Sequence, residues 1–393
     1  MVVASVGWST RSDADACGRE AAARALELLP RRKHKLALVF GSSWLDQEQL
    51  LRGVRAVLDG VPLTGQSTAG EIIPDGPISH SCVVVLLASD ALACSIGVSE
   101  GVATAPRLAG QQAASHALRD FPASPRAGFL LFGDGLIPKY ADVVRGIQEV
   151  FGTSSLVVGA MAGDDLRFTQ TYQYAQDRAV SRAVTGVLLG QPLKIGIGIE
   201  HGFAPISKPR RITRARANVL MELDRKPAAS VYEEYFGADA AERLCVTGQT
   251  RQAIAYPLGL CNETTDRWLL RNVVSFGEGG SLVCNGDVQE GTWLQLMLGS
   301  RELVLNAARK AAQQAVQALN RVTCVLVFDS VIRRTLLGAA HAALEIARIR
   351  EAVGSSTPMA GCYTYGEQVS FSASPAESCA TQTGSVLVVA LGD

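Results

Sequence analysis

The sequence predicts an α/β protein of two domains, built from repeated strand–helix–strand units with covered, mostly aliphatic sheets. Three observations predict this. The chain has 393 residues, of which 48% are hydrophobic and only 19% charged, so it can bury a large core. Short aliphatic runs alternate with helical stretches, as in layered α/β folds. One order of strand, helix, strand, glycine and acid occurs three times along the chain.

The first unit begins with an aliphatic strand at residues 35–40 and continues with a helical stretch at 46–58. A second strand leads to Gly65 and then to Glu71, and the aliphatic run 82–87 follows as a further buried strand. The unit therefore reads as a strand–helix–strand layer that ends in a glycine turn.

The other two units repeat this order, and in each unit the acid lies six residues after the glycine. The second unit comprises a strand at 127–132, a helix at 139–151, Gly159, Asp165 and a strand at 183–189. The third unit comprises a strand at 323–328, a helix at 336–353, Gly361, Glu367 and a strand at 385–390. Three units with one spacing indicate a shared architecture.

The domain boundary is expected after the second unit. A strand at residues 194–200 is followed by a glycine turn, and the turn at 224–227 precedes a new helical stretch. We therefore predict an N-terminal domain of residues 1–225 and a C-terminal domain of residues 226–393.

Charge and hydropathy exclude several partners. Lys plus Arg and Asp plus Glu are both 37, so the net charge is zero and gives no electrostatic case for nucleic acid or an anionic membrane. The weakly charged stretch 82–98 contains Asp90 and is shorter than the ~20 apolar residues of a membrane span. The N-terminus has no export signal, so we expect the protein in the cytoplasm.

Several sequence motifs of common chemistry are absent. The nine cysteines are scattered and form no C-x-x-C pair, which predicts reduced thiols rather than disulfides or a zinc ribbon. The sequence also has no phosphate-binding P-loop and no H-E-x-x-H zinc helix. Ser67 lies in a glycine turn that misses the nucleophile-elbow spacing by one residue. A hydrolase or transferase that uses Ser67 or a strand-end carboxylate stays an alternative.

The acids Glu71, Asp165 and Glu367 follow apolar strands, at whose carboxyl ends open α/β sheets gather their ligands. Each carboxylate either braces its own glycine turn through N–H groups or accepts hydrogen bonds from a ligand. The sequence leaves both interpretations open.

Two histidines stand out among the five. His201 ends an apolar strand beside Gly202 and Phe203, where its imidazole would face a pocket. His80 and Cys82 are two residues apart on one face of a strand end, which is a weak two-ligand pattern. For any one histidine, a place in the core or on the surface is the simpler explanation.

Four motifs in order resemble the FIST family, whose N- and C-terminal domains would cover nearly the whole chain. They are Ser67-Thr-Ala-Gly-Glu-Ile72, Ala162-Gly-Asp-Asp-Leu-Arg-Phe168, Glu222-Leu-Asp-Arg-Lys-Pro-Ala228 and Gly361-Cys-Tyr-Thr-Tyr-Gly-Glu367. The resemblance implies a non-enzymatic sensor of small ligands in bacterial signal transduction. Its ligand residues would be Ser67, Thr68, Glu71, Asp164, Asp165, Arg167, Tyr363, Tyr365 and Glu367.

The ligand and partner implied by the resemblance take two forms. In the sharper form the chain binds b-type haem through His201, senses nitric oxide and acts on a separate histidine kinase or a cyclic-di-GMP pathway. In the broader form the ligand is an amino acid and no haem is bound. The chain departs from the family pattern at Ser330, where a cysteine is expected, and at Cys379, where an asparagine-containing segment is expected. These departures weaken the transfer of ligand chemistry to the C-terminal domain.

Overall fold

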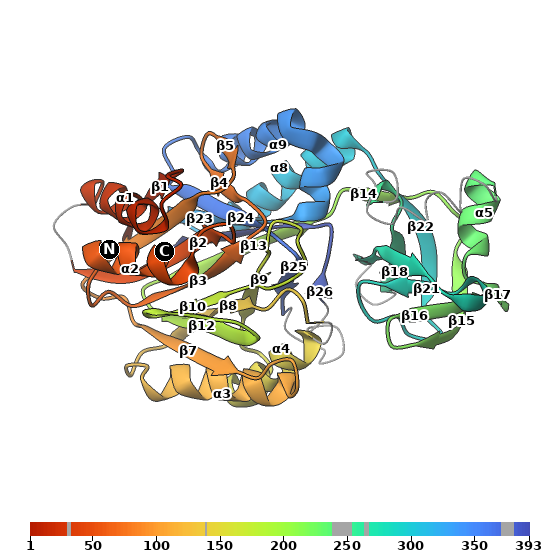
Figure 1. Cartoon of the computed structure of the whole chain (residues 1–393), viewed down its shortest axis with the longest axis horizontal. Helices are drawn as coiled ribbons and strands as arrows, with labels where there is room; N and C mark the ends of the chain where they lie inside the picture. Colours follow the sequence, from red (N-terminus) through yellow and green to blue (C-terminus); the bar gives the residue numbers. More distant parts are fainter. Residues whose placement is uncertain (30–32, 138–139, 238–253, 263–266, 371–380) are drawn as a thin grey trace.

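The computed structural model describes residues 1–29, 33–137, 140–237, 254–262, 267–370 and 381–393. It has two bodies (Figure 1): a larger one that holds both chain ends, and a smaller one, formed by residues within 203–299, at the far right of the view. The larger body is a mixed α/β structure with helices over its sheets, which confirms the predicted fold class.

The larger body consists of three repeats, each running strand, helix, strand, helix, strand, hairpin, strand. The first repeat comprises β1 (Val3–Ser9), α1 (Ala14–Glu27), β2 (His34–Ser42), α2 (Gln47–Val57), β3 (Leu63–Thr68), β4 (Glu71–Ile73), β5 (Gly76–Ile78) and β6 (Cys82–Ala88). The second comprises β7 (Cys94–Glu100), α3 (Pro106–Arg119), β8 (Arg126–Gly133), α4 (Tyr140–Phe151), β9 (Val157–Met161), β10 (Gln173–Ala175), β11 (Arg178–Val180) and β12 (Ala183–Gly190).

The third repeat is interrupted. It comprises β13 (Lys194–Glu200), α8 (Arg301–Gln317), β23 (Val322–Ser330), α9 (Val331–Val353), β24 (Met359–Thr364), β25 (Gly366–Val369), β26 (Thr381–Gln382) and β27 (Val386–Gly392). Between β13 and α8 lies the smaller body. Its elements are β14 (Phe203–Pro205), β15 (Arg210–Arg216), β16 (Val219–Leu223), β17 (Lys226–Pro227), α5 (Ser230–Phe236), β18 (Leu258–Asn262), β19 (Arg267–Arg271), β20 (Val273–Phe276), the 3-10 turn Glu278–Gly280, β21 (Leu282–Cys284) and β22 (Trp293–Gly299).

The predicted units are present, but each repeat starts earlier than predicted, with an additional strand and, in the first two repeats, a helix directly after it. The predicted division at residue 225 falls inside the smaller body, in the tight turn before β17. In space the strands group by repeat, with the smaller body inserted into the third. We call residues 203–299 the inserted domain.

The three repeats exchange their hairpins in a circle. Each six-stranded sheet contains the four long strands of one repeat followed by a hairpin from another: β1-β6-β2-β3-β10-β11, β7-β12-β8-β9-β25-β26 and β13-β27-β23-β24-β4-β5. The first repeat thus completes the sheet of the third, the third that of the second, and the second that of the first. This exchange links the three sheets of the larger body and relates its repeats by a pseudo-threefold axis.

The repeat glycines are required by the close approach of two parallel strands. Gly65, Gly159 and Gly361 lie opposite Val39, Leu131 and Val327 on the first strand of each pair. A Cβ atom on any of these glycines would overlap the carbonyl oxygen of the opposite residue. The glycine therefore recurs because a side chain has no room there.

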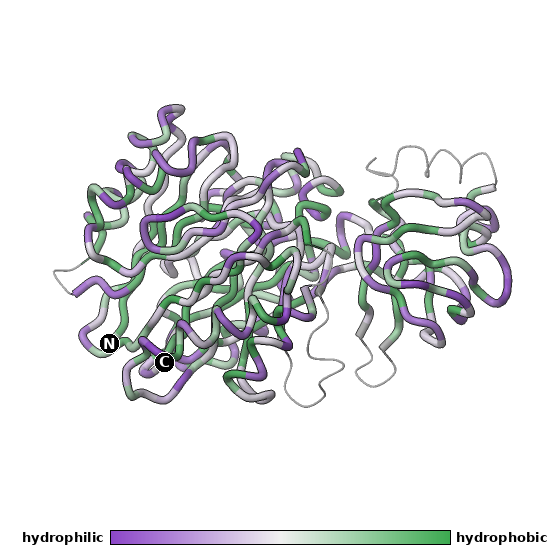
Figure 2. The backbone as a smooth tube through the Cα atoms, turned by 60° about the horizontal axis from the view of Figure 1, so that its bottom comes forward, coloured by the Kyte–Doolittle hydropathy of each residue, from purple (hydrophilic) through white to green (hydrophobic). Residues whose placement is uncertain are grey.

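Three phenylalanines from equivalent strand positions meet at the centre of the larger body. Phe40, Phe132 and Phe328 are fully buried, and their ring centroids lie 5.9, 5.8 and 6.1 Å apart in edge-to-face arrangements. Figure 2 shows hydrophobic residues along the strands and hydrophilic ones mainly on the outer helices and loops. The pseudo-threefold axis therefore passes through an apolar core shared by all three sheets.

The longest helices belong to the larger body and pack on its sheets. None of the helices in the described ranges is long and apolar enough to cross a membrane.

Candidate functional site

The strand ends of the three repeats meet in a ring of backbone hydrogen bonds. The turns at residues 67–70, 161–165 and 363–365 follow the second parallel strand of their repeats. They are joined by N–H donors of Ala69 to Tyr363 O (2.9 Å), Tyr363 to Gly70 O (2.8 Å), Tyr365 to Met161 O (3.2 Å) and Gly163 to Ser67 O (3.2 Å). We call these three turns the turn ring. It gathers the predicted ligand residues of all three repeats at one end of the pseudo-threefold axis.

Glu71 and Glu367 are matching buried acids in the first and third repeats. Both are fully buried. Each accepts hydrogen bonds from a threonine three residues earlier and a serine that precedes the last strand: Thr68 and Ser81 for Glu71, Thr364 and Ser385 for Glu367, the latter pair at 2.6 Å each. Burial raises the pKa of each carboxyl to about 8, although the hydroxyl donors lower it. These contacts favour the brace interpretation.

Asp165 is not the counterpart of these two acids, so the three-fold pattern predicted from spacing is wrong there. Glu71 and Glu367 each pair with the residue that directly follows a repeat glycine, which is Cys362 after Gly361 and Ala160 after Gly159. The residue of the second repeat that makes the same pairing is Gln173, opposite Gln66 after Gly65. Its Oε1 accepts the N–H of Ala183 at 3.2 Å. Gln173 lies fourteen residues after Gly159, so the second repeat carries a longer loop at this point.

Asp164 organises this loop, residues 164–171. Its carboxylate accepts the N–H groups of Phe168, Thr169 and Gln170 at 2.9, 2.6 and 3.0 Å, and the Tyr365 hydroxyl at 2.5 Å. Burial alone would raise the pKa of Asp164, but these hydrogen bonds lower it below its usual range. The Tyr365 ring also stacks on Phe168, with centroids 5.0 Å apart. The loop is thereby fixed to the third repeat.

The other side of the loop contacts the first repeat. Asp165 accepts the hydroxyls of Ser42 and Ser43 at 3.0 and 2.8 Å. The guanidinium of Arg167 donates to Ser43 O at 2.9 Å and lies 4.8 Å from the ring centroid of Trp44. Predicted residues from the second repeat thus meet residues of the first that the sequence did not single out.

Tyr363 faces a second arginine. Arg334 lies 4.8 Å from the ring centroid of Tyr363 and donates to Ala69 O at 2.6 Å and to the Ser79 hydroxyl at 2.8 Å. Tyr363 is fully buried, and its hydroxyl has no hydrogen-bond partner within the described structure. Arg334 therefore connects the third repeat to the turn of the first.

Ser67 is held as a structural residue. It is fully buried, its hydroxyl donates to Gly163 O at 2.8 Å, and it accepts the N–H of Tyr172 at 2.9 Å. A nucleophilic serine needs a base that takes its proton, whereas the Ser67 hydroxyl donates its hydrogen bond to a backbone carbonyl. These contacts do not support the Ser67 hydrolase alternative.

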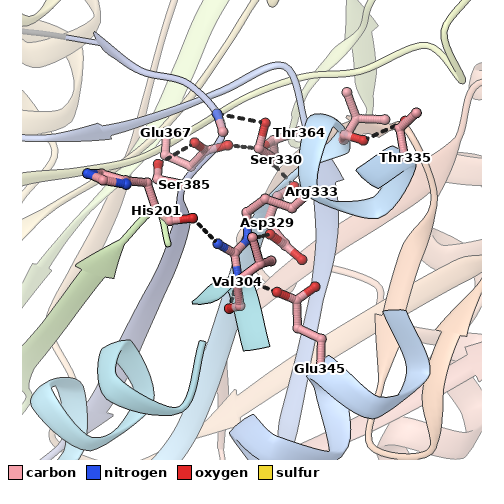
Figure 3. Close-up of polar contacts among 12 residues, drawn as sticks. His201, Val304, Asp329, Ser330, Arg333, Thr335, Glu345, Thr364, Glu367 and Ser385 are labelled. Atoms are coloured by element: carbon pink, nitrogen blue, oxygen red, sulfur yellow. Dashed lines mark hydrogen bonds and ion pairs between the residues drawn. The ribbon is translucent and has the colours of Figure 1, made fainter. Parts of the chain in front are cut away.

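A buried charged cluster lies beside the turn ring, in the third repeat only (Figure 3). The fully buried guanidinium of Arg333 donates to Asp329 at 2.9 Å and to Glu345. It also donates to the carbonyls of His201 at 2.6 Å and Val304 at 2.9 Å. His201 directly precedes the inserted domain and Val304 follows it, so Arg333 joins its two ends.

Asp329 lies in the field of the second acid of this cluster, Glu345. Burial and the neighbouring Glu345 charge raise its pKa well above the usual range, against the effect of Arg333. In the other repeats the position of Asp329 is taken by Gly41 and Gly133, whose free space is filled by the hydroxyl ends of Tyr174 and Tyr140.

The residues at His201 do not fit an axial haem ligand. Its Nδ1 accepts the N–H of Phe203 at 2.9 Å, so the neutral imidazole carries its proton on Nε2. Iron binding through Nε2 requires a free lone pair there, and the proton would have to move to Nδ1 at the expense of this bond. Burial lowers the pKa of His201 to about 4.

His80 and Cys82 do not form a shared site. His80 lies on the surface against Trp44, with ring centroids 5.4 Å apart, whereas Cys82 is fully buried. Burial raises the pKa of the Cys82 thiol well above its usual range, which disfavours the thiolate that binds metals. Of the two departures from the family pattern, Ser330 accepts the N–H of Gly384 at 3.1 Å, and Cys379 lies outside the described residues.

The protein is a module of three α/β repeats with an inserted β-domain. The closed turn ring gathers polar groups at the strand ends of these repeats. A FIST N domain model matches residues 35–226, and a FIST C domain model matches residues 228–370. The chain belongs to the FIST family. FIST domains indicate a sensory role in signal transduction.

A curated relative, the uncharacterized protein MJ1623 of Methanocaldococcus jannaschii, is 26% identical over 166 residues, which are 40% of this chain and 32% of the relative. This chain thus spans about a third of that relative's length. Two solved structures of cyanuric acid hydrolases cover 100% of this chain and 99% of their own. The hydrolase from A. caulinodans is 11% identical with a TM-score of 0.34, and the other is 9% identical with a TM-score of 0.37.

The prediction that the chain is not an enzyme needs correction, because two of the solved structures that align with its whole length are cyanuric acid hydrolases. The only ground on which the prediction excluded catalysis was the resemblance to the FIST family. TM-scores of 0.34 and 0.37 give no argument for hydrolysis by this chain either.

The sequence identified the turn residues but missed Trp44, Arg333 and Arg334. An arginine in a helical stretch reads as a surface residue, and Trp44 stands in no motif. The signal available for Arg333 was an acid, Asp329, four residues earlier at the end of an apolar strand.

Proposed function

We propose that this FIST protein senses a small ligand at the turn ring and that the inserted domain passes the signal to a partner protein. The observation that carries the proposal is the loop 164–171, which exists only in the second repeat and connects all three repeats at the ring. Its side chains are on the surface there: Phe168 is 47% exposed, Leu166 46% and the neighbouring Trp44 59%. Such apolar exposure beside converging polar groups is typical of a ligand site.

Two features support the inserted domain as the output. Arg333 holds the carbonyls on both sides of it, and Phe203, Leu270 and Met297 pack on the start of α9. Gly202, with φ +75°, lies at the junction so close to α8 that a side chain would clash. A conformational change in the turn ring that displaces Asp329 or Ser385 would therefore alter the contacts at both ends of the inserted domain.

The finer forms of this function rest on the family resemblance. An amino-acid ligand agrees with a site whose guanidiniums can bind the ligand's carboxylate. The haem-based nitric oxide sensor would need His201 as its ligand, and the Phe203 contact argues against it. A separate histidine kinase or a cyclic-di-GMP pathway is the partner we propose, and cytoplasmic location stays part of the same proposal.

The test is a binding screen with the full chain, a Trp44→Ala/Phe168→Ala variant and a Leu108→Ala control, since Leu108 is 50% exposed on α3, away from the ring. Amino acids, organic acids and haem are the probes, and isothermal calorimetry is the readout. We expect the double variant to lose binding that the control keeps. Equal binding by all three proteins would refute the site. A Soret band that His201→Ala abolishes would instead establish the haem form.

A further inference from the structure

Two guanidiniums at the turn ring lack a carboxylate partner. Arg167 donates to the carbonyls of Asp164 and Ser43 at 3.2 and 2.9 Å. Arg334 donates to a carbonyl and a serine hydroxyl. Neither belongs to an ion pair in the described part of the chain. Carbonyl oxygens orient a guanidinium but leave its charge uncompensated.

The acids nearby are already committed to other donors. Asp164 accepts the loop N–H groups and the Tyr365 hydroxyl, and Asp165 accepts two serine hydroxyls. Glu71, the acid whose field Arg334 reaches, is buried with a pKa of about 8, so it keeps its proton at neutral pH. In the described residues no carboxylate oxygen is paired with either guanidinium, so both guanidiniums can contact an anionic ligand directly.

The two arginines are linked to one exposed indole: Arg167 lies over Trp44, and Arg334 donates to Ser79, whose neighbour His80 contacts Trp44. The N–H of Asp165 binds Thr68 O at 3.3 Å, and Arg334 binds the next carbonyl, that of Ala69. Trp44 contacts both Arg167 and His80 and is still 59% exposed. Leu166 and Phe168 extend the apolar surface. A flat apolar group can stack on this surface while an anion meets the guanidiniums.

We infer that the turn ring binds an organic anion with a flat apolar body, its carboxylate or phosphate held by Arg167 and Arg334 and its apolar part on Trp44. This inference rests on the proposed function and specifies the ligand class of the same site.

The experiment compares four probes of one skeleton by isothermal calorimetry at up to millimolar concentration: 3-phenylpropanoate, 3-phenylpropylamine, 3-phenylpropanol and propanoate. The proteins are wild type, Arg167→Met, Arg334→Met and Trp44→Ala. The matched control is Arg126→Met, because Arg126 also lies over an aromatic ring, Phe151 at 5.7 Å, but at the opposite end of β8.

We expect 3-phenylpropanoate to bind best, and each ring arginine variant to weaken it roughly 10- to 100-fold, as expected for loss of a charge-assisted contact. The control should bind as wild type. No binding of this anion, or equal binding of the amine, overturns the inference.

The variants separate the two proposals. Binding that Trp44→Ala abolishes but the arginine variants keep overturns the ligand charge and leaves the sensor site in place. Binding that none of the three ring variants changes overturns both.

Discussion

Replacing Arg333 by methionine should destabilise the protein more than any neutral change in the same cluster. The guanidinium is fully buried and makes hydrogen bonds to two carboxyl groups and two carbonyls. The Arg333→Met variant would leave Glu345 as a buried carboxylate without a cation, and the carbonyls of His201 and Val304 without a donor. Breaking a buried ion pair in this way costs about 3–5 kcal/mol.

Asp329→Asn is the matched variant. Burial and the Glu345 charge raise the pKa of Asp329 well above its usual range, so a neutral amide of the same size suits this site, and its NH2 group can donate to Glu345. We expect a cost of about 1 kcal/mol or less. The two variants remove atoms from the same site, so their difference isolates the charge.

The assay is urea unfolding followed by circular dichroism, combined with limited proteolysis of the folded chain at residues 200–203 and 299–304. Arg333→Met should lower the unfolding free energy by about 3–5 kcal/mol and speed cleavage between the inserted domain and the larger body. An Asp329→Asn variant as unstable as Arg333→Met would show that Asp329 is ionised. Wild-type stability and cleavage in Arg333→Met would refute the role of the cluster at the junction.

Two further predictions concern the larger body. The folded-state pKa values of Glu71 and Glu367 are about 8, above the ordinary 4.5, so the stability that these acids contribute is complete below pH 4.5 and is lost as the pH rises through about 8. The double variant Glu71→Gln/Glu367→Gln should reduce this fall of the unfolding free energy with pH. An unchanged dependence of the unfolding free energy on pH would contradict the raised pKa values. Phe132→Ala should cost about 3–5 kcal/mol in urea unfolding, because its ring contacts Phe40 and Phe328 on the axis; a loss below about 1 kcal/mol would show that the triad is not a shared core.

The strands and helices of the three repeats could be predicted because each is a local pattern. Residues 36–40, 129–132 and 324–328 are continuously apolar, as strands buried on both faces are. The hairpin exchange could not be predicted, since the pairing of Glu71 with Cys362 joins residues that are far apart in the chain. Local periodicity contains no information about which repeat receives a hairpin.

The candidate site shows the same division. Spacing placed Glu71 and Glu367 in equivalent positions, but it also assigned Asp165, which belongs to a longer loop; only the pairing of Gln173 with Gln66 identifies the true counterpart. The brace role of the acids depends on Ser81 and Ser385, which directly precede the last strand of their repeats. Burial and partners from distant segments decide these roles, and a single sequence does not contain them.

The turn ring is the proposed ligand-binding surface of this protein. Hydrogen exchange of the full chain, with and without saturating 3-phenylpropanoate, tests it most directly. We predict slower exchange at residues 42–44, 163–168 and 363–365, with a smaller change at the junction around Gly202, and no change in Trp44→Ala. Slower exchange confined to the inserted domain, or to the hollow beside α3 lined by Thr104, Arg107 and Asp142, would contradict the claim.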